Sequence, residues 1–229
     1  AASYLRGIRS VNVPTTLLAM VDAAVGGKTG IDLPTGKNLV GAFCQPALVV
    51  CDPTLLNTLP PRELRSGWAE VIKTAILFDP PLFQGLKTGE AATEQVIAAC
   101  LRHKGAVLSR DVYDRGERQL LNLGHTLGHA VEVCSDYRVT HGEAVAVGIA
   151  GMARAFSRDA EEMIALLEQF GLPTRTELSP RALAQAALHD KKRRGDTVTL
   201  VIPERIGGCT LRSVPTNTLE EIFQRCLAL

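Results

Sequence analysis

Three histidines and one glutamate are the residues of this sequence best suited to chemistry. His125 and His129 lie in Asn122-Leu-Gly-His-Thr-Leu-Gly-His, His141 begins His-Gly-Glu, and Glu70 lies far upstream. Imidazole and carboxylate groups together suit a divalent ion such as zinc, and a set of three protein ligands is typical of a catalytic zinc with one open position. The sequence otherwise offers cations and amides. It therefore predicts a metal-assisted reaction on an anionic, hydroxylated small molecule.

A continuous helix is predicted over 117–133. At about 100° per residue, Arg118, Asn122, His125 and His129 would fall within an arc of roughly 60° on a helix that is otherwise apolar. A single buried histidine is most often a satisfied core residue. Burying the whole polar stripe without a ligand would leave several donors unpaired, at about 1–3 kcal/mol each. The stripe therefore favours a functional interpretation.

His141 is predicted to begin another helix. Thr140 suits the N-cap and Glu143 the third helical position, so the pair indicates a capping box and argues against Glu143 as a metal ligand. Glu70 and Lys73 are three residues apart on a third predicted helix. An exposed Glu–Lys pair is common and weak, but the apolar residues around this pair make its burial plausible.

Composition excludes several classes of protein. The chain has 229 residues and a net charge of +1, which suggests neither nucleic acid nor a membrane surface as partner. No apolar run reaches the roughly 18 residues of a membrane span, and we find no signal peptide. The six cysteines lack CxxC or disulfide-dense spacing, so we expect reduced, mostly buried thiols in a cytoplasmic protein. The sequence begins at Ala1 without a Met, and we expect it to be part of a longer protein.

The predicted fold is mainly α. Two strand-like runs, 10–14 and 47–52, have loops rich in Gly and Pro between them, and the pattern after Pro60 is helical. Helices are expected at 62–78, 80–88, 90–109, 117–133, 141–158, 161–169, 180–189 and 219–226, with a hairpin of 197–203 and 209–214 around Gly207-Gly208. Two short strands form no stable sheet alone. We therefore expect residues 1–60 to be the remaining edge of an α/β domain, followed by a helical domain over 61–229.

A second cluster is rich in glycine and lysine. Val25-Gly-Gly-Lys28-Thr-Gly30 is followed by Gly36-Lys37-Asn38, a composition that lets backbone and charge approach an anion. It is neither a Walker A loop nor a GxGxxG motif. Taken alone it favours a phosphate site no more than a glycine-rich turn. The run 191–194 adds four further cations, of which Arg193 and Arg194 suit a solvated loop.

The order of these motifs resembles the 3-dehydroquinate synthase family. The resemblance is carried by Val13-Pro-Thr-Thr, Gly26-Gly-Lys-Thr, Gly36-Lys-Asn-Leu-Val-Gly, Ala69-Glu-Val-Ile-Lys, Leu121-Asn-Leu-Gly-His-Thr-Leu-Gly-His and His141-Gly-Glu-Ala. It runs from Ala1 to about Lys192 and implies two domains, an N-terminal NAD-binding α/β domain and a C-terminal helical metal domain. The family's glycine-rich NAD motif would lie before Ala1, so we expect no turnover from this chain alone.

The resemblance also implies roles for individual residues. Glu70, His125 and His141 match metal ligands, for zinc or cobalt. The matched substrate contacts are Lys28 and Asn38 at the phosphate, Arg6 from across a homodimer interface, and Lys73, Lys104, Arg118, Asn122, His129 and Lys192 (or Lys191). The matched NAD contacts are Thr15, Thr16, Asp22, Lys28, Lys37, Leu55, Leu56, Asn57 and Thr58.

The implied reaction belongs to the shikimate pathway of aromatic amino acid biosynthesis. It takes 3-deoxy-D-arabino-heptulosonate 7-phosphate to 3-dehydroquinate and phosphate. NAD oxidises the C5 hydroxyl, phosphate is eliminated, the hydride is returned, and the opened ring closes by an aldol step. A metal that acts as a Lewis acid would ease the first step.

Three alternatives stay open at this point. Related sugar-phosphate cyclases, such as deoxy-scyllo-inosose and valiolone synthases, share the metal site and the use of NAD. Their substrates lack the carboxylate, so they have no need of Lys104, Arg118 and Asn122. A metal-dependent alcohol dehydrogenase would need fewer anion-binding cations. A non-catalytic metal-binding fragment would bind metal without turnover.

Overall fold

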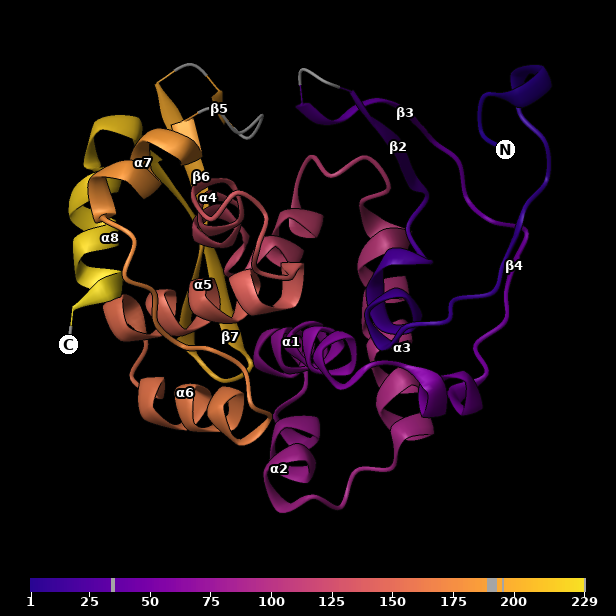
Figure 1. The fold of residues 1–229 in the computed structure, drawn as a ribbon, viewed down its shortest axis with the longest axis horizontal. Coiled ribbons are helices and arrows are strands. Elements are labelled where there is room, and N and C mark those ends of the chain that lie inside the picture. Colours follow the sequence, from indigo (N-terminus) through magenta and orange to yellow (C-terminus); the bar gives the residue numbers. More distant parts are fainter. Residues whose placement is uncertain (34–35, 189–192, 195, 229) are drawn as a thin grey trace.

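The computed structural model describes residues 1–33, 36–188, 193–194 and 196–228. Helices dominate it, as predicted (Figure 1). The larger helices are α1 (Pro61–Phe78), α2 (Pro80–Thr88), α3 (Thr93–Arg110), α4 (His125–Cys134), α5 (His141–Phe156), α6 (Ala160–Gln169), α7 (Pro180–Leu188) and α8 (Leu219–Leu227). The described part of the chain contains no helix long and apolar enough to cross a membrane.

Three small sheets accompany the helices. Strands β1 (Val11–Asn12) and β4 (Leu48–Val49) are parallel. The antiparallel pair β2 (Lys28–Leu33) and β3 (Gly36–Phe43) forms a second sheet, and β5 (Arg193–Arg194), β6 (Thr197–Arg205) and β7 (Gly208–Pro215) form the third. The predicted hairpin around Gly207 is confirmed, since β6 and β7 pair on either side of it.

Helix α1 lies at the centre of the molecule, between α4–α8 on one side and α3 with the N-terminal strands on the other (Figure 1). Its start is set by Pro61, whose missing N–H costs nothing in the first turn, and Pro80 prevents its continuation. Asp79 ends α1 and caps α2 by accepting a hydrogen bond from the Leu82 N–H at 2.9 Å. Every residue from Ala69 to Leu77 is buried, so α1 is a core element throughout its second half.

Helix α5 joins two apolar cores. Its residues Val145, Ile149 and Ala153 belong to the core formed with α1, α2, α3 and α6, whereas Val147 and Met152 belong to the core of α4, α7, α8 and β6. The N-terminal segment shares the first core through buried side chains such as Leu17 and Met20. The two proposed domains are therefore packed together here, and the boundary between residues 60 and 61 stays a prediction.

The predicted helix over 117–133 is wrong as one element. A 3-10 helix, Glu117–Asn122, ends before Leu123-Gly124, and α4 begins at His125. Gly124 has φ +76, and a Cβ there would lie 2.7 Å from the Ile149 backbone N of α5. Close contact with α5 thus forces a left-handed residue that breaks the helix. Arg118 and Asn122 therefore do not continue the α4 stripe of His125 and His129.

The segment between Gly26 and Phe43 also differs from the prediction, because the expected loops form the β2–β3 hairpin. The Thr29 hydroxyl donates to the Ala42 carbonyl at 2.7 Å, and a Cβ at Gly41 would lie 1.9 Å from the Thr29 carbonyl oxygen. These glycines allow two strands to approach closely, a use that composition does not distinguish from a loop.

Smaller differences concern helix ends and cysteines. Helix α3 begins three residues later than predicted, at Thr93, and α5 ends at Phe156 rather than at Arg158. All six cysteines are free, in agreement with the prediction, but only Cys100 and Cys226 are buried. The expectation of mostly buried thiols is therefore wrong.

Candidate metal and anion site

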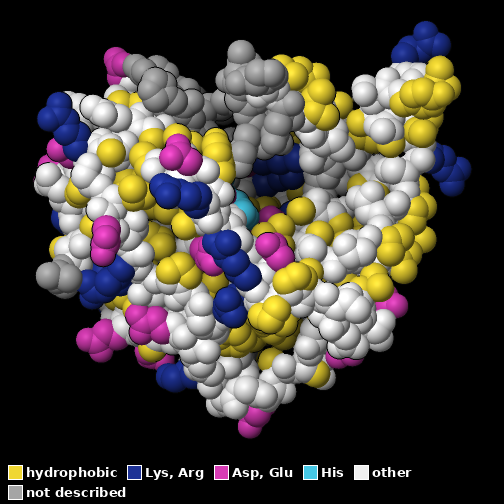
Figure 2. All heavy atoms as spheres, in the orientation of Figure 1, with side chains coloured by type: hydrophobic (Ala, Val, Ile, Leu, Met, Phe, Trp, Pro, Cys, Tyr) yellow, Lys and Arg dark blue, Asp and Glu magenta, His cyan; other side chains and the backbone are white. Residues whose placement is uncertain are grey.

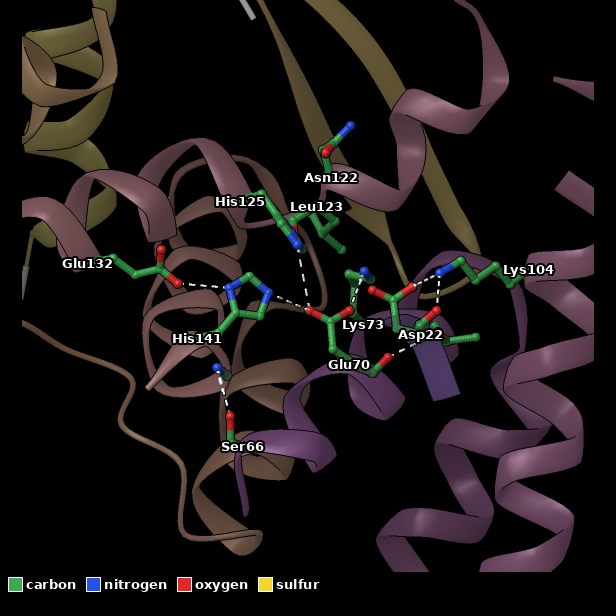
Figure 3. Close-up of polar contacts among 12 residues, drawn as sticks. Asp22, Ser66, Glu70, Lys73, Lys104, Asn122, Leu123, His125, Glu132 and His141 are labelled. Atoms are coloured by element: carbon green, nitrogen blue, oxygen red, sulfur yellow. Dashed lines mark hydrogen bonds and ion pairs between the residues drawn. The ribbon is translucent and has the colours of Figure 1, made fainter. Parts of the chain in front are cut away.

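Glu70, His125 and His141 converge from three different helices. Glu70 lies on α1, whereas His125 and His141 are the first residues of α4 and α5. Glu70 Oε1 is 3.6 Å from His125 Nε2 and 3.3 Å from His141 Nε2 (Figure 3). One donor atom from each residue lies within 4.8 Å of the others, the spacing of a cluster that could hold a metal ion. The structure thus brings the predicted ligands together, and their binding of a metal stays a prediction.

Close contact between α1 and α5 places His141 beside Glu70. The Gly142 N–H donates to Ser66 Oγ at 3.0 Å, and a Cβ at Gly142 would lie 2.0 Å from the Ser66 carbonyl oxygen. Ser66 is one helical turn before Glu70. The predicted capping box of Thr140 and Glu143 is confirmed, so Glu143 holds the helix start and takes no part in the cluster.

Each histidine of the cluster has its Nδ1 atom engaged elsewhere. His125 Nδ1 lies 3.0 Å from the Leu123 carbonyl oxygen, and His141 Nδ1 lies 2.8 Å from Glu132 Oε1 (Figure 3). Carbonyl and carboxylate oxygens only accept hydrogen bonds, so the hydrogen is on Nδ1 in both rings. Both Nε2 atoms are then left to face Glu70, which is the arrangement of metal-binding histidines.

Glu70 has the properties of an anionic ligand. It is 1 % exposed, and apart from the ion pair with Lys73 its oxygens accept no hydrogen bond from the described residues. Burial alone would raise the pKa of Glu70, but the ion pair with Lys73 and the nearby His141 and His125 hold that pKa well below its usual range. Burying an ionised carboxylate that has only an ion pair with one lysine is still costly in the protein interior. A bound cation would offset that cost, so the residues present fit a divalent ion.

The electrostatics of Lys73 and His141 follow from the same carboxylates. Burial would lower the pKa of Lys73, yet Glu70 and Asp22 raise it. Burial would also lower the pKa of His141, whereas the hydrogen bond with Glu132 and the negative charges of Glu132 and Glu70 raise it to about 9. Without a metal, His141 is therefore an imidazolium ion at neutral pH, and a metal ion would have to displace its proton.

A second set of potential ligands overlaps the first. His129, Glu132 and His141 also place donor atoms within 4.8 Å of one another. The His129 ring lies 5.4 Å from the His125 ring and 6.1 Å from the His141 ring, measured between centroids. His129 therefore lies beside the cluster, as the helical spacing from His125 predicts.

A cavity of about 540 Å³ lies where the N-terminal strands meet α3. Its lining includes Asp22, Lys28, Phe43, Lys104 and Arg118. The space-filling view shows a hollow with Lys or Arg and His side chains at its floor (Figure 2). Lys28 and Arg118 thus open onto one cavity rather than onto opposite faces of the molecule. Three cations in one cavity favour an anionic ligand.

The cations of this cavity already have partners within the chain. Lys104 Nζ donates to the carboxylate and carbonyl oxygens of Asp22 (Figure 3), and Lys28 Nζ lies 2.5 Å from Asp114 Oδ2. The Arg118 guanidinium donates to the Gly26 carbonyl at 2.9 Å. Burial lowers the pKa of Lys104, and the neighbouring Asp22 opposes that shift.

The other predicted residues are more scattered. Asn122 donates to the Gln119 carbonyl at 3.1 Å, and Figure 3 shows its amide directed away from Glu70. Thr16 accepts a hydrogen bond from the Ala19 N–H, and Thr15 and Arg6 are exposed. Leu55, Leu56, Asn57 and Thr58 lie in the 3-10 helix Pro53–Thr58. Lys37 and Asn38 lie in β3 with side chains that are not described, and Lys191 and Lys192 lie outside the described residues.

Two residues near the site were missed from the sequence. Glu132 follows His125 by two helical turns, so helical spacing could have indicated it. Asp114 pairs with Lys28, yet it comes from an irregular segment with φ 59 and no pattern marks it. Only the tertiary structure brings Asp114, which lies 86 positions away, to Lys28.

Comparison with known proteins identifies the family of this chain. Residues 1–66 match the family model for the 3-dehydroquinate synthase N-terminal domain, and residues 67–193 match the model for the C-terminal domain. The 3-dehydroquinate synthase of Latilactobacillus sakei subsp. sakei (strain 23K) is 42% identical over 225 residues, which cover 94% of this chain and 63% of that protein. The chain thus spans less than two thirds of that relative's length.

Two solved structures share the fold. One is the 2-epi-5-epi-valiolone synthase ValA from Streptomyces hygroscopicus subsp. jinggangensis 5008 with NAD+ and Zn2+ bound, with a TM-score of 0.87 and 26% identity over 99% of this chain and 68% of that one. The other is a 2-deoxy-scyllo-inosose synthase complexed with carbaglucose-6-phosphate, NAD+ and Co2+, with a TM-score of 0.83 and 27% identity over 98% and 68%. Both domain models and the curated relative agree with the order of motifs, and the chain therefore belongs to the 3-dehydroquinate synthase family.

Proposed function

We propose that the protein containing this chain converts 3-deoxy-D-arabino-heptulosonate 7-phosphate to 3-dehydroquinate and phosphate. One observation carries the proposal: Glu70, His125 and His141 present ligand atoms to one point, close to a cavity lined by cations, in a chain of the 3-dehydroquinate synthase family. The alternative of a purely structural metal site has less support, because three protein ligands leave a coordination position for a substrate.

The cofactors are proposed from the fit of the residues and from the relatives. The metal, zinc or cobalt, would be held by Glu70 Oε1 and by the Nε2 atoms of the two histidines. The residues of this chain proposed to contact NAD are Thr15, Thr16, Asp22, Lys28, Lys37 and residues 55–58. When bound, the metal would supply a Lewis acid for a substrate hydroxyl, and NAD would accept a hydride and return it.

Residues of the chain itself would hold the two anionic groups of the substrate. Lys28 and Asn38 are proposed for the phosphate, and Lys104, Arg118 and Asn122 for the carboxylate and hydroxyls. Lys73 keeps Glu70 ionised, and His129 lies close enough to the cluster to contact a bound substrate. Fixed cations that orient both ends of the substrate would contribute much of the rate enhancement, and a strong base would contribute little.

The carboxylate set separates this proposal from the related cyclases. Lys104 and Arg118 line the same cavity, and they are 8 % and 3 % exposed. Within the chain Lys104 pairs with Asp22 and Arg118 donates to the Gly26 carbonyl. A substrate carboxylate would exchange with these partners, whereas a substrate that carries only a phosphate has no second anion to place there. The structural relatives are cyclases of other specificity, and the sequence relative is a dehydroquinate synthase.

The direct test measures phosphate release by the full-length protein with zinc and NAD supplied. We expect turnover of the heptulosonate phosphate and none of a phosphorylated sugar without a carboxylate, such as glucose 6-phosphate. Glu70→Gln should abolish turnover, whereas the control Lys87→Met, at an exposed ion pair on α2, should not. Equal turnover of both substrates would favour the alternative cyclases, and no turnover of either would argue against an enzyme.

Two finer points are proposed with the function. We propose that the 229-residue chain alone binds the metal without turnover, which the same assay on the chain by itself would test. We also propose a cytoplasmic homodimer in which Arg6 reaches a neighbouring subunit. Arg6 is exposed and lies in the N-terminal segment. Light scattering on wild type and Arg6→Ala would test the dimer. The phosphate-release assay would measure the effect of the substitution on turnover.

A further inference from the structure

Glu132 is a buried carboxylate at the end of α4 that touches a member of the candidate metal cluster. It is 8 % exposed, and its Oε1 lies 2.8 Å from His141 Nδ1. We propose that Glu132 is a positioning residue that orients the His141 imidazole, so that His141 Nε2 faces the metal. This inference rests on the proposed function, because it assumes that Glu70, His125 and His141 hold a metal.

The two histidines differ in how their rings are held. His125 has a side chain 10 % exposed, and its Nδ1 faces the carbonyl of Leu123, two residues earlier in the chain. The side chain of His141 is 34 % exposed, and it is the first residue of its helix. The His141 ring is therefore less confined by packing, and a hydrogen bond from another element has more to contribute.

Packing between α4 and α5 sets the position of Glu132. Gly128 and Glu132 are four residues apart, so they share one face of α4, and Gly124 directly precedes that helix. A Cβ at Gly128 would lie 3.0 Å from the Ala144 carbonyl oxygen of α5, and a Cβ at Gly124 would lie 2.7 Å from the Ile149 N and 2.8 Å from the Val145 carbonyl oxygen. These contacts bring the backbones together along the face that ends in Glu132. Helix α4 thus supplies one ligand, His125, and the residue that orients another.

The geometry argues against Glu132 as a ligand. His129, Glu132 and His141 are close enough to form a second cation site, but the contact between Glu132 Oε1 and His141 Nδ1 is a hydrogen bond at 2.8 Å. A metal there would have to displace the hydrogen on Nδ1 while the opposite nitrogen, Nε2, faces Glu70. With Glu132 accepting the hydrogen of Nδ1, Nε2 stays directed at Glu70.

The test is the metal affinity of variants, measured by competition with a chromophoric chelator for Zn²⁺ and from the visible spectrum of the Co²⁺ form. Glu132→Ala should weaken zinc binding by about 10–100-fold, the usual effect of losing such a supporting contact. Glu132→Gln keeps an acceptor for the Nδ1 hydrogen without the charge, so its loss should be smaller. Both should alter the Co²⁺ absorption bands, which report ligand geometry. The control is Glu168→Gln. Glu168 lies on α6, its carboxylate accepts a hydrogen bond from the Thr174 hydroxyl at 2.8 Å, and it contacts none of the three proposed metal ligands.

The outcomes separate this inference from the proposed function. The positioning role is supported if wild type binds one ion, Glu132→Gln binds it more weakly, and Glu132→Ala binds it most weakly. Unchanged affinity and spectrum in both variants would overturn it while leaving the metal site intact. Binding of two ions, with one lost in Glu132→Ala, would make Glu132 a ligand and also overturn it. No binding by wild type would overturn both this inference and the proposed function. The Gln variant covers the case in which Glu132→Ala does not fold.

Discussion

The histidine cluster and the lysine-lined cavity are prepared for opposite charges in different ways. In the cluster, each Nδ1 is engaged by a carbonyl or carboxylate, which leaves Nε2 atoms and the Glu70 oxygens facing one another. In the cavity, Lys28 and Lys104 are paired with Asp114 and Asp22 of the same chain. The cluster could therefore hold a cation as it stands, whereas an anion that bound in the cavity would have to exchange with internal partners.

This difference has an energetic reason. A divalent ion is bound by few ligands at short distances, so ligand directions must be set beforehand by surrounding hydrogen bonds. A phosphate or carboxylate is bound by charges that tolerate rearrangement, and a lysine without any partner would be costly where it is buried. Internal carboxylates supply such partners for Lys28 and Lys104. The two regions should differ in their response to metal, pH and salt.

The largest expected effect is at the buried ion pair of Glu70 and Lys73. Glu70→Gln removes the carboxylate that pairs with buried Lys73, and Lys73→Met removes the lysine that pairs with buried Glu70, so each should destabilise the metal-free chain by about 3–5 kcal/mol. Zinc should restore the stability of Lys73→Met, because the metal replaces the missing positive charge beside Glu70. It should not restore the stability of Glu70→Gln, which lacks one of the proposed metal ligands. Thermal unfolding with and without zinc measures both.

The matched control is Lys87→Met, which breaks an ion pair about half exposed on both sides. Its melting temperature should change little, and zinc should stabilise it as much as wild type. An equal zinc-induced rise in Glu70→Gln and Lys73→Met would contradict the assignment of Glu70 as a ligand.

An intermediate effect is expected from pH. The pKa of His141 is raised from 6.5 to about 9 in the metal-free fold, so its contribution to stability is fully present below about pH 6.5 and is lost as pH rises through 9. Metal binding needs the neutral ring, so zinc affinity should rise over the same interval. Unfolding midpoints and zinc affinities between pH 6 and 10 would show opposite trends.

His141→Gln is the control for this prediction, because it removes the titrating group. Its metal-free stability should lose the decline between pH 6.5 and 9. If the zinc affinity of wild type stays constant across that interval, zinc does not displace a proton from His141.

The smallest effect on stability is expected at Lys28 and Asp114. The lysine side chain is 51% exposed, so breaking the pair should change the free energy of unfolding by about 0–1 kcal/mol. Lys28→Met should weaken binding of inorganic phosphate, and the loss should shrink at high salt. Asp114→Asn should not weaken it, because it removes the competing anion. Calorimetric titration at low and high salt distinguishes these results, and weaker phosphate binding in Asp114→Asn would contradict exchange of partners.

The sequence by itself determined the helical class, the approximate extents of most helices, and the family. Those features depend on local signals such as Pro61 at a helix start, the capping box at Thr140, and short motifs in a fixed order. Residue types and spacing also indicated the three histidines and Glu70 as candidates for a metal site, and the family resemblance selected Glu70, His125 and His141 among them. Local propensity and residue chemistry are expressed within a few residues of chain, so they can be recognised without coordinates.

Only the tertiary structure decided how these parts meet. Gly124 breaks the expected helix because α5 lies against it, and Gly41 pairs with Gly30 where the Thr29 carbonyl leaves no room for a Cβ. Lys28 finds Asp114 across 86 positions, and Lys104 finds Asp22 across 82. Glu132 reaches His141 because α4 and α5 pack through glycines. Such contacts depend on the space left between elements, which no spacing along the chain encodes.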